Sequence, residues 1–233
     1  MGCGAGKVDN FRFSSGLPDC CKTNPKEYKL VAEIPGARLV EMKLPAGGQD
    51  KKHDHPKHSM YVIKGGKLQL TPPPGQTEGS AEIELPSGAA PIIPPGAHQV
   101  KNVGDAEVNI IFCEPYVSCS PCGSPDEFIL PWDVAPDNYK VLAQDDDFLT
   151  IELTMEPGAT DALHSHRAHL IYVLAGSEVT IYPGGDMDKG QAVQIKPGAA
   201  IPAPVSAGAL FTRHVVKNSG SDTLKMVFFE QKQ

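Results

Sequence analysis

Apolar residues in this chain come in short runs, without the stripes that amphipathic helices would require. The runs VNIIF (108–112) and LIYVL (170–174) are bounded by glycine, proline and polar residues. Other segments, such as KLQLT (67–71) and EVTIY (178–182), alternate apolar with polar residues. Alternation with a period of two is typical of strands that bury one face, and short strands at regular spacing are typical of antiparallel sandwiches and barrels. We therefore predict an all-β protein without a long helix.

The chain also repeats itself. HDHPKHSMYVIKGG at 53–66 returns as HSHRAHLIYVLAGS at 164–177, an offset of 111 residues (164 − 53). HQVKNVGDAEVNIIFCE at 98–114 returns as HVVKNSGSDTLKMVFFE at 214–230, an offset of 116 residues (214 − 98). Such a repeat indicates two similar units in tandem.

The positions of the repeats predict the division of the chain. We expect an N-terminal extension over 1–25, a first domain over 26–114, a linker over 115–137 and a second domain over 138–233. The linker is rich in Pro, Ser, Cys and Asp, which is typical of loops. It contains the only tryptophan, Trp132, which we interpret as an anchor for domain packing.

Composition excludes several classes of protein. A net charge of −7 lacks the basic footprint that nucleic acid requires, so no nucleic-acid partner is expected. No stretch approaches the length of about 20 apolar residues that spans a bilayer. The six cysteines do not resemble the disulfide framework of a small secreted domain, so we expect a reducing, cytoplasmic location.

Two N-terminal and linker motifs have an alternative interpretation. Gly2 and Cys3 resemble the start of acylated proteins, although Gly6 stands where the usual signal has Ser or Thr, so a weak membrane tether is the alternative to a plain N-terminus. Cys119 and Cys122 form a CSPC motif that would suit a redox pair or half a zinc site, but it has no partner motif, and a linker with free thiols is favoured.

All eight histidines lie in the repeated motifs. The members of each His-x-His pair are two residues apart on a strand, so both imidazoles point to one face. A third histidine follows after a short turn, and a fourth comes from a distant strand. Convergent neutral imidazoles are typical metal ligands, whereas imidazoles crowded together without a cation would repel one another on protonation. We therefore predict metal ligands, rather than core or solvated histidines, at His53, His55, His58, His98, His164, His166, His169 and His214.

These motifs resemble the cupin superfamily, specifically the two-domain bicupins. The first cupin motif, G-x5-H-x-H-x(3,4)-E-x6-G, is matched by the spacing from Gly47 to His53 and from Gly158 to His164. The second motif is G-x5-P-x-G-x2-H-x3-N. Its final H-x3-N is matched by the segments HQVKN (98–102) and HVVKN (214–218). The resemblance implies two tandem cupin-type β-barrels, also described as jelly rolls or double-stranded β-helices.

Two departures from the family pattern concern the ligands. His58 and His169 stand where cupins usually have glutamate, one residue closer to the His-x-His pair. The second motif of the second copy is stretched by an insertion, and we interpret the loop PAPVSAGALFTR (202–213) as a lid over the second barrel. The resemblance therefore carries the ligand role more directly to the other six histidines.

An all-imidazole ligand set leaves the charge of a divalent metal nearly uncompensated, which favours an anionic, metal-chelating substrate. The resemblance extends to three-histidine cupin dioxygenases, so we expect an Fe(II) dioxygenase with one divalent metal in each barrel. Zn, Mn, Ni and Cu are the alternative metals. Alternative functions are a redox-neutral lyase, isomerase or hydrolytic enzyme, or a non-enzymatic metal-binding protein; a closed four-histidine zinc site would be structural.

Charged residues near the histidines are further candidates. Arg167 and Arg213 flank the second set and would hold an anionic substrate, with solvated side chains as the alternative. Lys51, Lys52 and Lys57 flank the first set and have the same two interpretations.

The remaining candidates end or follow the motif strands. Glu114 and Glu230 would orient a ligand or act as a base, although an exposed strand end is the favoured interpretation. Tyr61 and Tyr172 would pack in the core or donate a hydrogen bond to substrate. Because cupins often pair through their sheets, a homodimer is a further expectation.

Overall fold

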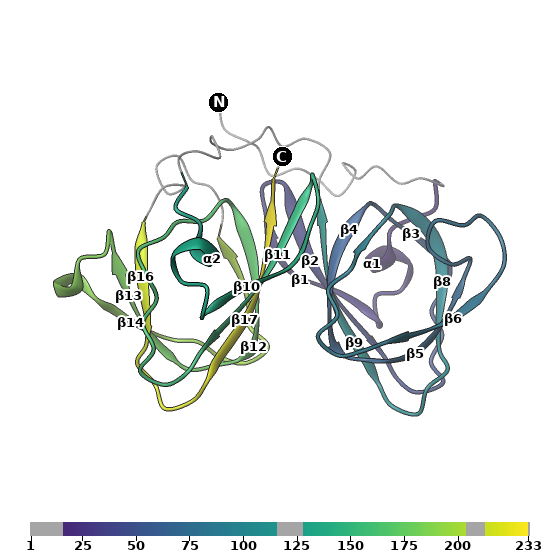
Figure 1. The fold of residues 1–233 in the computed structure, drawn as a ribbon. Helices are drawn as coiled ribbons and strands as arrows, with labels where there is room; N and C mark the ends of the chain where they lie inside the picture. The colour runs from purple at the N-terminus through teal and green to yellow at the C-terminus, as the bar shows by residue number, and fades with distance from the viewer. Residues whose placement is uncertain (1–15, 116–127, 204–212, 233) are drawn as a thin grey trace. The chain divides into compact units, whose positions relative to one another are not determined.

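The computed structural model describes residues 16–115, 128–203 and 213–232, and its chain forms two compact units, Met1–Cys119 and Ser120–Gln233. Both units consist mainly of antiparallel strands (Figure 1). The prediction of an all-β chain is therefore confirmed.

The first unit contains one sheet of five strands, in the order β1-β2-β9-β4-β7, and one of four strands, in the order β3-β8-β5-β6. Their bounds are β1 Tyr28–Ile34, β2 Ala37–Leu44, β3 His53–His55, β4 His58–Lys64, β5 Gly66–Thr71, β6 Ala81–Leu85, β7 Ile92–Ile93, β8 Gly96–Asn102 and β9 Val108–Pro115.

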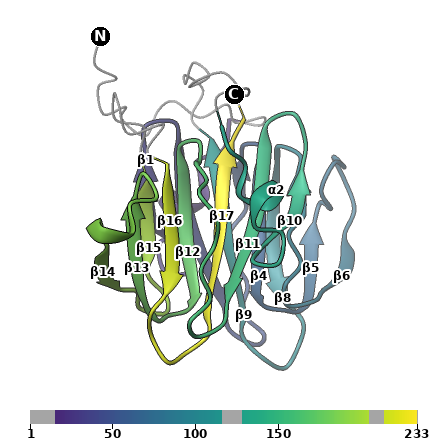
Figure 2. The same ribbon diagram turned by 60° about the vertical axis from the view of Figure 1, so that its left-hand side comes forward.

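The second unit repeats this arrangement with sheets β10-β11-β17-β12-β15 and β14-β13-β16. Figure 2 shows β17 between its two partners, β11 and β12. The bounds are β10 Tyr139–Gln144, β11 Phe148–Met155, β12 His169–Ala175, β13 Glu178–Pro183, β14 Gln191–Gln194, β15 Ala200–Ala203, β16 His214–Asn218 and β17 Leu224–Gln231.

Apolar side chains from both sheets form the core of each unit. In the first unit, Val40 on β2 and Ile110 on β9 belong to the same buried cluster as Leu68 on β5 and Val100 on β8. Within the described ranges, every sheet has two edge strands that pair with a neighbour on one side only. The structure thus shows two-sheet units, and closure of each unit into a barrel remains a prediction.

Three single-turn helices, which the sequence pattern did not predict, occur in the described ranges: α1 Cys20–Thr23, α2 Pro131–Val134 and the 3-10 helix η2 Met187–Lys189. The side chain of Asp19 caps α1 by accepting a hydrogen bond from the backbone N–H of Lys22 at 3.0 Å. A single turn leaves no periodic pattern in the sequence, which is why these helices escaped prediction. None of the helices described has the length and hydrophobicity needed to cross a bilayer.

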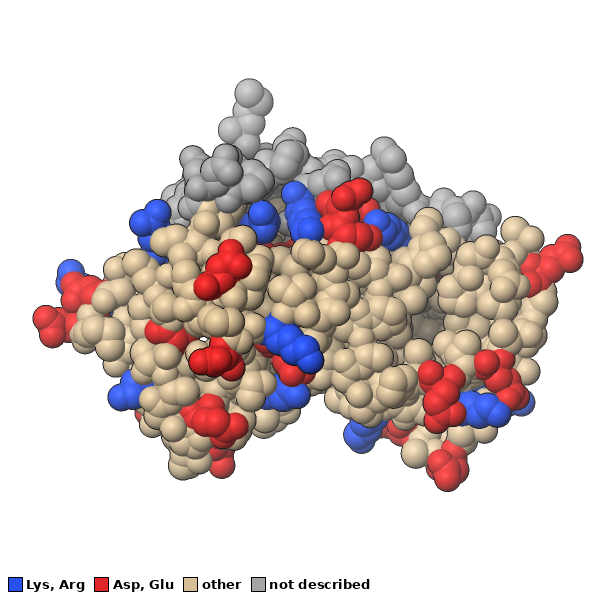
Figure 3. Space-filling model, viewed as in Figure 1, with Lys and Arg blue, Asp and Glu red and all other residues tan. Residues whose placement is uncertain are grey.

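Charged side chains of both signs are interspersed on the face shown in Figure 3. The described lysines and arginines on that face alternate with aspartates and glutamates and do not form a continuous basic stripe. The absence of a nucleic-acid partner stays a prediction from the net charge of −7.

The asparagine of each second motif holds the start of a loop in place. Asn218 is fully buried, and its Nδ2 donates to the carbonyl oxygens of Met155 and Asp222, both at 2.8 Å. Its Oδ1 accepts from the Ser177 hydroxyl at 2.8 Å. Asn102 makes the corresponding bonds to Leu44 and Ala106 in the first unit. These asparagines are therefore part of the folding framework of each unit.

We predict that Asn218→Ala lowers the free energy of unfolding of the second unit by about 3 kcal/mol, because it leaves several buried hydrogen-bonding groups without a partner. Urea denaturation followed by circular dichroism measures the change. Gln194→Ala, at an exposed position of β14 in the same unit, is the control. Equal stability of the two variants would contradict the assigned role of Asn218.

Candidate metal centres

Four imidazoles gather inside the first unit, from three strands. His53 and His55 lie on β3, His58 begins β4, and His98 lies on β8, where it is the register partner of His53. Donor nitrogens of His53, His55 and His98 lie within 4.8 Å of one another. The ring of His58 lies 5.0 Å from that of His55, measured between centroids. The structure thus brings together the predicted histidines of the first copy.

The second unit brings together its own four histidines. Donor nitrogens of His164, His166 and His214 lie within 4.8 Å of one another. His169 begins β12, and its ring centroid lies 4.8 Å from that of His166. The His-x-His pair of this copy does not form the predicted strand, because only an isolated bridge joins His164 to His214.

A shared hydrogen-bond pattern fixes the orientation of these rings. The Nδ1 atoms of four histidines contact the carbonyl oxygen two residues earlier: His53 at 2.8 Å, His58 at 2.9 Å, His164 at 2.8 Å and His169 at 2.6 Å. A carbonyl oxygen only accepts hydrogen bonds, so we assign each of these Nδ1 atoms as the donor, with the Asn24 amide nitrogen as a second neighbour of His53 at 3.1 Å. The Nε2 atom of each neutral ring then carries a lone pair, as metal coordination requires, and that of His164 also lies 3.2 Å from the Tyr139 hydroxyl.

The two rings of the first His-x-His pair test whether a cation fits. His55 donates from Nδ1 to the Glu114 carboxylate at 2.5 Å, so its Nε2 also carries a lone pair. The Nε2 atoms of His53 and His55 nevertheless lie only 2.8 Å apart. Two facing lone pairs at this distance repel each other unless a proton or a metal ion lies between them. The donor set therefore fits a divalent metal held by His53, His55 and His98.

Burial favours the uncharged form of His53, His58 and His169. It lowers the pKa of His53 to about 3, with a further lowering by His55. Burial likewise lowers the pKa of His58 and of His169 to about 4. Neutral imidazole is the form that binds metal, so these three rings are suited to coordinate a metal ion at neutral pH.

Glu114 and Glu230 are buried, with exposed fractions of 0% and 1%, so the expectation of exposed strand ends was wrong. Glu114 accepts from His55, and Glu230 accepts from Nδ1 of His166 at 2.9 Å. Each glutamate thereby orients one imidazole. A glutamate after an apolar strand has the same sequence pattern whether it is exposed or buried, so the pattern alone could not show that these two glutamates are buried.

The two glutamates differ in their cationic partners. Arg38, the register partner of Glu114, donates from Nε to its carboxylate at 2.8 Å, whereas the register partner of Glu230 is Leu149. Burial alone would raise the pKa of Glu114, but the hydrogen bond from His55 and the charge of Arg38 lower it to about 2. Burial raises the pKa of Glu230 to about 7, and this effect exceeds the lowering by His169 and by Arg167, whose guanidinium lies 3.6 Å from the carboxylate.

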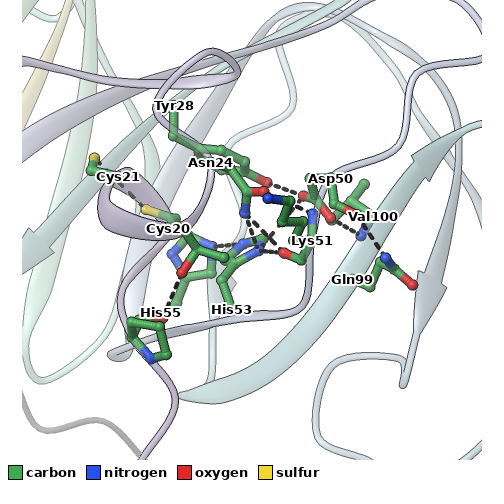
Figure 4. A network of polar contacts seen from close by, with 12 residues as sticks. Cys20, Cys21, Asn24, Tyr28, Asp50, Lys51, His53, His55, Gln99 and Val100 are labelled. Atoms are coloured by element: carbon green, nitrogen blue, oxygen red, sulfur yellow. Dashed lines mark hydrogen bonds and ion pairs between the residues drawn. The ribbon is translucent and has the colours of Figure 1, made fainter.

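A buried tyrosine and aspartate support each His-x-His pair, and the sequence analysis did not identify them. Figure 4 shows Tyr28 and Asp50 close to His53. The Tyr28 hydroxyl donates to Asp50 at 2.8 Å, and the Tyr139 hydroxyl donates to Asp161 at 2.9 Å. Both pairs are separated by the 111-residue offset of the first motif, so extending the repeat toward the N-terminus would have found them.

The interior of the second unit holds a cavity of about 510 Å³. His166, His169 and His214 reach it, together with Arg167 and Tyr139. The remaining lining residues are apolar: Leu153, Ala168, Ile171, Val179, Ile181, Pro183, Val193, Ile195, Ile201, Ala203, Val216, Met226 and Phe228. A ligand in this cavity would contact both the histidines and a largely apolar wall.

The interior of the first unit is almost filled. Its corresponding cavity, which His58 and His98 reach, measures about 60 Å³. A separate pocket of about 420 Å³, lined by residues 72–77 and 93–98 with Lys52, reaches the first cluster through His98. The two units therefore present their histidines to very different spaces.

Smaller side chains explain the larger cavity. Ile93 is the register partner of His58, whereas Ala203 is the register partner of His169. Leu68 pairs with Asn102 in the first unit, and the shorter Val179 pairs with Asn218 in the second. On the other side, Leu68 pairs with Ile83, whereas Val179 pairs with the shorter Val193. The loss of side-chain volume at these positions opens the second unit.

The arginines predicted for substrate binding differ in position. Arg167 lines the cavity and lies with its guanidinium 5.0 Å above the Phe128 ring. Arg213 is exposed and is not among the lining residues of that cavity. Lys51 and Lys52 are exposed and Lys57 is half-buried. Arg167 is thus the best placed of these residues to meet a ligand in the second unit.

Tyr61 and Tyr172 are buried on the strands that begin with His58 and His169. Alternation along β4 places Tyr61 on the face opposite Met60 and Val62, which belong to the interior core. The cavity of the second unit is lined by Tyr139 and not by Tyr172. This placement favours the packing role that the sequence also allowed.

Several predicted features lie outside the described residues. These are the proposed acylation sites at Gly2 and Cys3, the CSPC motif with Cys119 and Cys122, and most of the lid loop, residues 204–212.

Comparison with known proteins adds evidence on the fold. No protein-family model and no curated protein matches the sequence. Structures of oxalate decarboxylase from Bacillus subtilis superimpose with a TM-score of 0.58 at 16% identity, over 88% of this chain and 72% of theirs. One structure of that enzyme concerns its Mn(II) centres. A cupin 2 conserved barrel domain protein from Leptotrichia buccalis matches with a TM-score of 0.49 at 12% identity, over 88% of both chains.

At such low sequence identity the likeness concerns the arrangement of the strands. Oxalate decarboxylase is a bicupin, and the likeness spans both units of the chain. The predicted resemblance to the bicupins is confirmed at the level of the fold.

Proposed function

We propose that the protein is a metal-dependent enzyme whose reaction takes place in the second unit. The observation that carries this proposal is the cavity of about 510 Å³, which His166, His169 and His214 line. Cavities and clefts with a few convergent polar groups are typical of active sites. The filled interior of the first unit favours a structural or regulatory role for its histidine cluster.

His164, His166 and His214 would hold the metal in the second unit, with His169 as a neighbouring imidazole. A bound divalent ion would supply Lewis acidity and, if it is Fe(II), the ability to activate oxygen. Glu230 orients His166 through Nδ1, and the carbonyl of Ala162 orients His164. These contacts keep the Nε2 atoms directed toward a common point.

The cavity also suggests the class of substrate. Its wall is apolar, and its cationic lining residue is Arg167, two positions before His169. We propose a substrate with an anionic, metal-chelating head near the histidines and Arg167, and an apolar body against Ile171, Ile201 and Phe228. The sequence analysis expected the anionic head, and the apolar body is an addition from the cavity.

An Fe(II) dioxygenase remains our first proposal for the reaction, because a three-histidine set without a metal-bound carboxylate is what the resemblance to cupin dioxygenases implies. A redox-neutral lyase with Mn(II) is the second candidate, since the fold is shared with the manganese enzyme oxalate decarboxylase. Closure of each unit into a barrel and formation of a homodimer are further proposals that accompany the cupin fold.

We predict one divalent metal ion for each histidine cluster. Elemental analysis of Mn(II)-loaded protein should find two equivalents in the parent chain and one in either His55→Ala or His166→Ala, because each change removes a central donor from one cluster. The two variants serve as controls for each other. Unchanged metal content in both would contradict the assignment of the ligands.

We predict that Ala203→Ile narrows the cavity and weakens binding of ligands with long apolar tails. Alkyl hydroxamates provide the probe, since acetohydroxamate and octanohydroxamate share a chelating head. In the metal-loaded parent, affinity should rise by about 4-fold for each methylene that becomes buried. Isothermal titration calorimetry should show that each added methylene raises the affinity much less in Ala203→Ile. The affinity of this variant for acetohydroxamate should equal that of the parent chain.

Ile93→Ala, the mirror-image change in the first unit, is the matched control for Ala203→Ile. It should leave the preference for octanohydroxamate as it is in the parent chain. An equal loss of tail preference in both variants would show that the tail does not occupy the second cavity.

We predict oxygen consumption by the Fe(II)-loaded protein with anionic chelating substrates such as long-chain 2-oxo acids or diketones. An oxygen electrode measures the rate, which His166→Ala should abolish, while Ile93→Ala should retain it. Turnover of such substrates by Mn(II)-loaded protein without oxygen uptake would instead favour the redox-neutral lyase.

A further inference from the structure

The first unit contains a thiol cluster beside its histidines, composed of Asp19, Cys20, Cys21 and Arg38. Cys20 is completely buried, Asp19 and Arg38 are 1% and 3% exposed, and Cys21 is half-buried. The two sulfur atoms lie 3.9 Å apart, and Figure 4 marks their contact with a dashed line. A carboxylate oxygen of Asp19 and both sulfur atoms lie within 4.8 Å of one another.

The second unit shows that the fold does not require this cluster. At the 111-residue offset (131 − 20), the residues equivalent to Asp19, Cys20 and Cys21 are Leu130, Pro131 and Trp132. Helices α1 and α2 occupy matching places, each just before the first strand of its unit.

Arg38 is also specific to the first unit. It faces Glu114 in the register of β2 and β9, and the equivalent partner of Glu230 is Leu149. At the equivalent positions, the second unit therefore has apolar residues, whereas the first unit has two thiols, a carboxylate and a guanidinium. Burying the Asp19 carboxylate and the Arg38 guanidinium costs free energy that apolar residues would not, which points to a chemical role for the cluster.

The spacing of the thiols matches that of two ligands on one ion. A tetrahedral zinc ion holds thiolate sulfurs at about 2.3 Å, which places two of them about 3.8 Å apart. The observed separation of 3.9 Å agrees with this value and is far longer than the S–S bond of about 2.05 Å in a disulfide. The half-buried side chain of Cys21 provides access from outside.

We propose that Asp19, Cys20 and Cys21 form a second metal site in the first unit, which takes a thiophilic divalent ion such as Zn²⁺ or Cd²⁺. Thiolates select softer ions than imidazoles do, so this site differs in preference from the histidine cluster. On binding, the two thiol protons pass to solvent and two metal–sulfur bonds form. The positive charge of Arg38 stabilises the resulting thiolates.

The site is placed to influence the first histidine cluster. The Cys20 sulfur lies within 4.8 Å of donor atoms of both His55 and Glu114. Those two residues are joined by the hydrogen bond that orients His55. Occupation of the thiol site would therefore change the electrostatic environment of a ligand of the other centre.

Titration with Cd²⁺ tests this proposal, because cadmium bound to thiolates has an ultraviolet charge-transfer band that imidazole ligands do not produce. The experiment uses the full chain with Cys3, Cys119 and Cys122 replaced by alanine, so that no thiol outside the described residues contributes. One equivalent of Cd²⁺ should produce the band. Cys21→Ser should abolish it, and Cys113→Ala, which removes a buried thiol on β9, should retain it.

Cys21 is the preferred position for this change because it is only half-buried, and circular dichroism verifies that the variant folds. Asp19→Asn leaves both thiols in place and should weaken Cd²⁺ binding while the band remains at saturation. The proposal is wrong if Cys21→Ser retains the full band. It is also wrong if the chain with Cys3, Cys119 and Cys122 replaced by alanine shows no band. His55→Ala should retain the band, which distinguishes the thiol site from the histidine cluster.

Discussion

The structure depends on the hydrogen bonds that the imidazole Nδ1 atoms donate outward. Carbonyl oxygens orient His53 and His164, and buried glutamates orient His55 and His166. Each bond leaves an Nε2 lone pair directed toward the centre of a unit, and in the first unit two of these atoms are 2.8 Å apart. A proton or a metal ion between these atoms removes the repulsion of facing lone pairs, and the three donor nitrogens of each cluster fit a metal ion.

Two copies of one arrangement have diverged around this common requirement. The first unit fills its interior and surrounds its histidines with further polar groups, including Arg38 and the thiols of Cys20 and Cys21. The second unit replaces several bulky apolar residues with smaller ones and opens a cavity beside its histidines. Within one chain, the same fold thus supports one centre with an almost filled interior and one beside a large cavity.

Sequence reasoning was most successful where the chemistry is local or repeated. Alternating strands, the internal repeat and the placement of every histidine are visible in the residue order, and the structure brings the histidines together as expected. Single-turn helices and the burial of Glu114 leave no periodic signal. The cavity escaped prediction because it arises from small volume differences, such as Ala203 opposite His169, whose effect depends on strand register.

The central claim is that each unit holds a metal ion between its imidazoles. Anomalous diffraction from crystals of the metal-loaded protein, recorded at the absorption edge of the metal, tests this claim most directly. We predict one anomalous peak for a metal ion bound by the Nε2 atoms of His53 and His55. A second peak should mark a metal ion bound by the Nε2 atoms of His164 and His166. Refined coordinates with the rings in place but no anomalous density between them would contradict the account.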